Sequence, residues 1–175
     1  HQDSMRKLML RMVSLEGGEL ASRRVNSQDL VFSDKKESER IQKVAQQLVE
    51  ARLISTGLDI QGQSYYEPAH DALVRAWARL WEWIKAQGEG KLGLLYKLSL
   101  AVADYREHQS NEYLWQDDPR LLQLQADLAN KDHPFNAVEE NFITDSIQLK
   151  KKNRRRRRLI TTLVSLGLMG LGIFA

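Results

Sequence analysis

The chain has 175 residues, of which 42% are hydrophobic, and it contains no cysteine. This composition is sufficient for one or two small domains with apolar cores, and it excludes disulfides and thiolate chemistry. The formal net charge is +3, but eight of the 26 basic residues lie in 150–158, which leaves 18 against 23 acidic residues elsewhere and argues against a nucleic-acid-binding face on the folded part.

The first element expected in chain order is a helix over residues 4–15, with Ser4 as its N-cap. Its apolar residues recur at helical spacing, and they are Met5, Leu8, Met9, Met12 and Val13. A Gly-Gly pair at 17–18 should end this helix. Residues 20–26 alternate well enough to predict a short strand, and residues 27–32 favour a helical turn.

A second helix is expected over residues 36–54, where the apolar residues again recur at helical spacing; these are Ile41, Val44, Ala45, Leu48 and Ala51. Two short β-like runs around Gly57 and Gly62 then predict a hairpin. Another helix should begin at His70 or Asp71, and its apolar side would hold Leu73, Trp77, Leu80 and Ile84. The order of helix, strand, two helices and hairpin is typical of a winged-helix domain, here over residues 1–86; an unspecified small α+β domain is the alternative.

Residues 87–149 predict a helical domain, in which short helices pack as a small bundle. One apolar stripe contains Leu94, Leu95, Leu98, Val102 and Tyr105. A following helix should begin with Asp118 as cap and Pro119 at its first position. The last helix of this part opens with Asn136 three residues before Glu139, a spacing that predicts a capping box. The fold class expected for the whole chain is therefore mainly α.

The C-terminal part combines a basic run with an apolar run. The basic run, residues 150–158, contains Lys150, Lys151, Lys152, Arg154, Arg155, Arg156, Arg157 and Arg158. Residues 159–175 lack charge and predict a truncated transmembrane helix, with the basic run facing lipid headgroups and residues 1–149 in the cytoplasm. Two alternatives stay open: a buried or amphipathic helix leading into a further domain, and a nucleic-acid-binding tail built on the arginines.

Catalytic and metal-binding patterns are absent from the sequence. There is no G-x-x-x-x-G-K-[ST] and no H-E-x-x-H, and the four histidines have no metal-ligand spacing. We therefore expect neither a metal site nor a cofactor in this chain, and no enzymatic activity of its own. His70 is the exception of interest, because an imidazole at a helix N-terminus could donate a hydrogen bond to a phosphate. Asp71 could cap the helix or hold a neighbouring loop; in the simpler interpretation His70 is tied to nearby backbone.

Several short motifs in order resemble the winged-helix end of STAND-class NTPases, in particular the bacterial novel STAND family. The matching positions are Ala51, Arg52, Leu53 and Ile54, then His70, Asp71, Ala72 and Leu73, then Trp77, Leu80 and Trp83. Residues 139–158 are similar to that family's Phe-(Leu/Ile)-x-x-Ser helix, which runs into a basic stretch and an apolar segment. The resemblance covers nearly the whole chain.

This resemblance implies a regulatory segment of a nucleotide switch. In related proteins the histidine of a Met-His-Asp motif contacts the β-phosphate of ADP and holds the closed state; His70 and Asp71 match its last two positions, while Ala69 replaces the methionine. ADP or ATP would be bound by an NTPase core upstream of His1, since both ends of the chain suggest a piece of a longer protein. Opening of the switch would permit self-assembly.

The function expected from the sequence is thus regulatory and non-catalytic: latching of an ADP-bound closed state through His70 and Asp71, on a protein tethered to the membrane by residues 159–175. One alternative is a membrane-anchored DNA-binding winged-helix regulator, in which Arg40, Lys43 and Arg52 contact the major groove. Acidic residues on the same helix argue against it. The other alternative is a helical scaffold that binds a protein partner.

Overall fold

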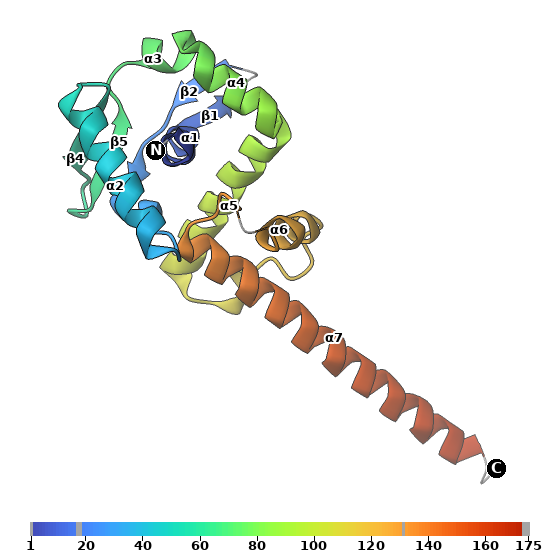
Figure 1. The fold of residues 1–175 in the computed structure, drawn as a ribbon. Helices are drawn as coiled ribbons and strands as arrows, with labels where there is room; N and C mark the ends of the chain where they lie inside the picture. Colours follow the sequence, from blue (N-terminus) through green and yellow to red (C-terminus); the bar gives the residue numbers. More distant parts are fainter. Residues whose placement is uncertain (1, 17–18, 131, 173–175) are drawn as a thin grey trace.

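The structure, a computed structural model, describes residues 2–16, 19–130 and 132–172. Within these ranges it is mainly helical, with seven α-helices and two small antiparallel sheets (Figure 1), which confirms the predicted mainly α class. The elements in chain order are α1 (Gln2–Arg11), β1 (Val13–Glu16), β2 (Glu19–Ser22), β3 (Val25–Asn26), η1 (Ser27–Leu30), α2 (Lys35–Glu50), β4 (Ile54–Leu58), β5 (Ser64–Pro68), α3 (Asp71–Ala76), α4 (Ala78–Gln87), α5 (Glu89–His108), η2 (Asn111–Tyr113), α6 (Arg120–Leu128) and α7 (Ala137–Gly172).

The first helix is shorter than its apolar pattern predicts, because residues 13–16 form a strand instead. Strand β1 pairs antiparallel with β2, and Val13 lies opposite Ser22. The apolar residues expected on one helical stripe are nevertheless buried, since Leu8 and Met9 reach the core from α1 while Met12 and Val13 reach it from the turn and strand that follow. Helix α1 lies between α2, α4 and the β1–β2 hairpin (Figure 1).

Helix α2 and the hairpin after it position the residues that precede His70. The side chain of Asp34 caps α2 by accepting a hydrogen bond from Lys36 N at 2.9 Å. The helix ends at Glu50 rather than at 54, and Arg52 adopts a left-handed φ of 58° that redirects the chain into β4. Strands β4 and β5 form the predicted hairpin, and β3 pairs with the other edge of β5.

The helix predicted from His70 to residue 84 is interrupted at Trp77. This residue has a φ of −81° and a ψ of 97°, so it ends α3 and precedes α4. The interruption frees backbone carbonyls, and the indole Nε1 of Trp81 donates to the carbonyl of Arg75 at 3.1 Å. The rings of Trp77 and Trp83 meet edge to face with centroids 5.6 Å apart. Aromatic packing therefore stabilises the bend between the two helices.

Buried side chains form two separate clusters, and the division falls inside α5. One cluster includes side chains from Leu8 to Leu92, and the other includes side chains from Leu94 to Ile143. Gly93 lies between Leu92 and Leu94, so a single continuous helix contributes to both cores. We call residues 2–92 the first unit and residues 94–149 the second unit.

Helix α7 leaves the second unit and continues away from it as a single helix (Figure 1). Among the described residues, no helix is both long and apolar enough to cross a membrane, so the predicted transmembrane helix over 159–175 and the membrane tether are wrong. The apolar part of α7 within the described backbone, residues 159–172, rises about 21 Å, which is short of a hydrocarbon core of about 30 Å. Residues 173–175 lie outside the described residues. The cytoplasmic placement of residues 1–149 rested on the tether and loses its basis.

Candidate functional site

His70 lies between the end of β5 and the start of α3, and it is exposed. Pro68 ends β5, and the backbone N–H of Ala69 donates to the carbonyl of Leu53 at 3.0 Å, which fixes the chain just before the histidine. His70 itself has extended backbone angles, and its carbonyl accepts from Leu73 N at 3.0 Å. Within the described residues its imidazole makes no capping hydrogen bond. The ring is therefore free to meet a group from outside the chain.

Asp71 connects two elements that are far apart in sequence. Its carboxylate Oδ1 accepts a hydrogen bond from Ser22 Oγ, at the end of β2. Of the two roles weighed for Asp71, capping its own helix or holding a neighbouring segment, the structure shows the second. Helix α3 has six residues, so its dipole is weaker than that of the longer helix expected from the sequence. The geometry around His70 thus depends more on the β2–α3 contact than on a helix N-terminus.

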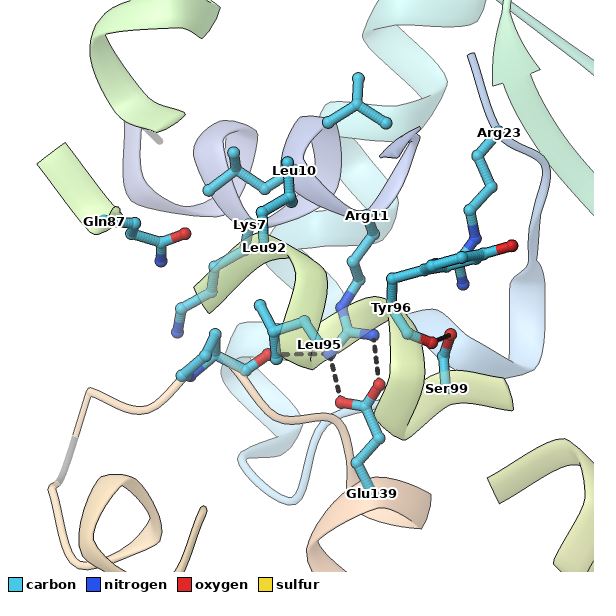
Figure 2. A pocket seen from close by; sticks show the side chains of 12 residues that line it. Lys7, Leu10, Arg11, Arg23, Gln87, Leu92, Leu95, Tyr96, Ser99 and Glu139 are labelled. Atoms are coloured by element: carbon cyan, nitrogen blue, oxygen red, sulfur yellow. Dashed lines mark hydrogen bonds and ion pairs between the residues drawn. The ribbon is translucent and has the colours of Figure 1, made fainter. Parts of the chain in front are cut away.

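A second polar site lies at the seam between the two units, and no sequence pattern indicated it. Arg11, the last residue of α1, donates from Nη1 to Glu139 Oε1 at 3.0 Å and from Nη2 to Glu139 Oε2 at 2.7 Å (Figure 2). Its Nη2 also donates to the carbonyl of Pro134 at 2.7 Å. The side chain of Arg11 is 11% exposed and that of Glu139 is 2% exposed, so this is a buried ion pair.

Glu139 has a further role at the start of α7. Asn136 N donates to Glu139 Oε2 at 3.0 Å, and Glu139 N donates to Asn136 Oδ1 at 2.8 Å, so the predicted capping box is confirmed. The amide of Asn136 also donates from Nδ2 to the carbonyl of Asp29 at 2.9 Å. Ala137 N donates to the carbonyl of Val31 at 2.9 Å. The start of α7 is therefore fixed to the first unit by polar contacts.

The charges at the seam influence one another strongly. Burial lowers the pKa of Arg11, but the attraction of Glu139 and its hydrogen bonds outweigh burial and hold that pKa above the usual range. Burial, followed by the nearby positive charge of Arg11, lowers the pKa of Arg23, which stacks on the ring of Tyr96 at 5.0 Å. Burial raises the pKa of Asp29. Arg11 therefore keeps its positive charge at neutral pH.

A cavity of about 30 Å³ opens beside this ion pair. Figure 2 shows Gln87 and Leu92 on one side of it and Arg23 with Tyr96 on the other. Two polar atoms among its lining residues, Arg11 Nε and Gln87 Oε1, are buried and have no hydrogen-bond partner within the described part of the chain. A cavity of this size accommodates one or two water molecules. The seam therefore combines polar groups that water can hydrate with apolar side chains such as Leu10, Leu92 and Leu95.

The remaining candidate residues do not converge on a site. In the described residues no group of three or more His, Cys, Asp or Glu is placed to hold a metal ion. Arg40 on α2 pairs with Glu37 at 3.5 Å, and Glu39 and Glu50 are exposed beside Lys43, so this helix offers no specific support for DNA binding. The basic side chains of 150–158 are exposed or half-buried on α7, and none forms a salt bridge within the described ranges.

The described residues form a mainly helical protein with two small sheets, in which His70 and Asp71 are exposed. Comparison with known families gives a match to the model of Novel STAND NTPase 1 over residues 1–113, more than half of the chain. The chain belongs to this family, as its motifs indicate. No curated protein and no solved structure matches it.

Proposed function

We propose that this chain is the regulatory, non-catalytic segment of a STAND signal-transduction NTPase, and that its first unit is a winged helix that latches an ADP-bound closed state through His70 and Asp71. ADP and ATP would be bound by an NTPase core in the same protein, because the chain has no Walker A sequence. Membership of the Novel STAND NTPase 1 family supports a role in such a switch.

The order of elements in the first unit supports the winged-helix interpretation. Helix α1 is followed by β3, the helical turn η1, α2 and the β4–β5 hairpin, and β3 joins that hairpin in one sheet. The β1–β2 hairpin is an addition between α1 and β3. His70 follows the last strand of this sheet directly, which is where a neighbouring module could contact it.

The exposed ring of His70 is the observation that carries the proposal. Because the ring has no capping role in its own chain, its hydrogen-bond donor is available to a phosphate oxygen. The bond from Ser22 to Asp71 restricts the backbone beside it, so that the ring is presented from a fixed position. A hydrogen bond to a charged group contributes about 1.5–3 kcal/mol. A ligand that makes this contact in one state alone shifts the equilibrium toward that state.

The test is His70→Ala in the complete NTPase, with ADP release measured by displacement of a fluorescent analogue. Loss of one such bond should speed ADP release roughly 10- to 100-fold. The matched control is His108→Ala, because His108 is also exposed but stacks on Tyr113 at the far end of α5. Faster release in the His70 variant with an unchanged control supports the latch. Equal release rates in both variants and the parent would overturn it.

A further inference from the structure

We infer that the Arg11–Glu139 pair is a releasable lock between the two units, and that the first unit, which contains His70, turns on α5 against the second unit when this lock opens. The effect of this movement on nucleotide release rests on the proposed function, whereas the movement itself does not. The inference concerns regulation of the latch from a site that lies away from His70.

The division of the core shows where such a movement is possible. Each unit has its own apolar cluster, and α5 is the continuous helix that belongs to both. Gly93 lies on α5 between Leu92 of one cluster and Leu94 of the other, and a Cβ at this position would meet nothing within 4 Å. Glycine in a helix interior lowers its stability relative to alanine. Gly93 therefore weakens α5 at the point where the two cores meet.

Several contacts across the seam are polar, while Leu95 and Tyr96 of the second unit also line one cavity with Leu10 of the first unit. Arg11 bonds Glu139 and Pro134, Asn136 bonds the carbonyl of Asp29, and Ala137 bonds the carbonyl of Val31. Water can replace each of these polar contacts when they separate, whereas it cannot replace apolar contacts. The cavity beside Arg11 already offers water a place at the seam.

The Arg11–Glu139 pair is the most buried ion pair within the described residues. A buried charge is stable when its partner is present and strongly unfavourable when that partner is removed. Arg11 belongs to α1 of the first unit, and Glu139 to α7 of the second. Removing the charge of Glu139 leaves the buried guanidinium of Arg11 without its counter-ion, and opening of the seam lets water reach it. An uncharged residue at position 139 should therefore favour the open arrangement.

Glu139→Gln is the sharpest test, because Gln keeps the capping box with Asn136 while the charge is lost. The chain has no cysteine, so two cysteines introduced at the exposed positions Lys43 and Gln123 label one site on each unit. Pulsed electron paramagnetic resonance then measures the distance between the labels. The matched control is Glu67→Gln, which makes the same substitution in the Arg24–Glu67 pair, whose two residues both belong to the first unit.

We expect a second, longer distance population in Glu139→Gln and a single distance in the control. Amide hydrogen exchange on the same chains should accelerate at least about tenfold at Asn136 and Ala137 and stay unchanged in α2 and α6. A single unchanged distance in Glu139→Gln would overturn the lock. Equal acceleration in α2, α6 and the seam would also overturn it, because the two units would then unfold as one body. Arg11→Lys, which keeps the charge but loses the paired geometry, should lie between Glu139→Gln and the parent.

These outcomes separate the lock from the latch. The measurements use the chain without nucleotide, so they report on the seam whether or not His70 contacts ADP. If Glu139→Gln opens the seam while His70→Ala leaves ADP release unchanged in the complete protein, the proposed function fails and the lock stands. If His70→Ala speeds ADP release while the seam stays closed in Glu139→Gln, the lock fails and the proposed function stands.

Discussion

At the scale of single residues, Asp29 is the acid whose charge the fold disfavours. Burial is the largest cause and raises its pKa, and the negative charge of Glu139 adds to this, while Arg11, Arg106 and Arg23 act in the opposite direction without cancelling it. The nearest cation, Arg106, lies 3.9 Å from the carboxylate. Asp29 therefore binds a proton more readily in the folded chain than in the unfolded chain.

Asp29→Asn should raise the stability of the chain at neutral pH. A carboxyl whose folded pKa is raised contributes its full stabilisation below its ordinary value of 3.8 and loses it as pH rises through the folded pKa. Asparagine does not titrate, so we expect a higher Tm than that of the parent at pH 7, by roughly 1–3 °C in a chain of this size. The difference in Tm between the variant and the parent should shrink as the pH falls toward 4. Thermal unfolding followed by circular dichroism at several pH values measures this difference. A lower Tm at pH 7 would show that attraction to Arg106 outweighs burial.

Residues close together in sequence could be predicted at this scale, and distant partners could not. The capping box of Asn136 and Glu139 follows from a spacing of three residues, and the structure has it. The partner of Glu139 across the seam is 128 residues away, and nothing in the local pattern of Arg11 distinguishes it from other basic residues of a helix. Burial, which follows from the tertiary fold, is what makes this pair significant.

At the scale of elements, Gly88 and Gly93, two of the three glycines near the start of α5, should respond oppositely to alanine. Gly88 joins α4 to α5 with a φ of 85°, a conformation that L-residues rarely adopt. Gly88→Ala should therefore destabilise the chain by about 1 kcal/mol or more. Gly93 is helical and has open space at its Cβ position, so Gly93→Ala should stabilise by about 0.5–1 kcal/mol. Urea unfolding of both variants measures the difference, and a loss of stability in Gly93→Ala would show that space at this position is required.

Elements could be predicted where the apolar residues keep one spacing, that of a helix or that of a strand, over the whole segment. The apolar stripes predicted for α2 and α5 are largely buried, although Ala51 is exposed and Leu95 and Tyr105 are half-buried. The β4–β5 hairpin was predicted as an element, and the structure has it. The bend at Trp77 could not be predicted, because one residue serves both as the end of α3 and as the start of α4 and the apolar spacing continues through it. Residues 13–16 formed a strand for a similar reason: short apolar runs fit both periods, and pairing with β2 decides between them.

At the scale of the whole molecule, charge and packing are segregated. Both apolar clusters end within residues 8–149, and the basic run follows on α7, beyond the second unit. Like charges four residues apart on a helix destabilise it, and this run places Arg154 and Arg158 in that relation. The absence of charge over residues 159–175 predicted a membrane span here, but none of the described helices is both long and apolar enough to cross a membrane.

Removal of residues 150–175 should therefore change the charge of the molecule and leave its fold intact. The shortened chain keeps both apolar clusters, including Leu149, and has 18 basic against 23 acidic residues instead of 26 against 23. We expect it to pass through a cation-exchange column at pH 7 that retains the parent, which has a pI near 9.2. Its Tm should stay within about 2 °C, because the main loss is one hydrogen bond from Asn153 to Gln116.

A chain ending at residue 158 is the control for this comparison, since it keeps the basic run and lacks the apolar segment. It should bind the cation exchanger as the parent does and unfold at the same temperature as the chain ending at residue 149. If the chain ending at 149 alone unfolds several degrees earlier, the basic run contributes to packing against the loop at Gln116 and Asp117, which lines a shallow groove with Arg154 and Arg157. Equal unfolding temperatures of both chains would show that the two units supply the stability of the protein, whereas the basic run of α7 supplies its positive charge.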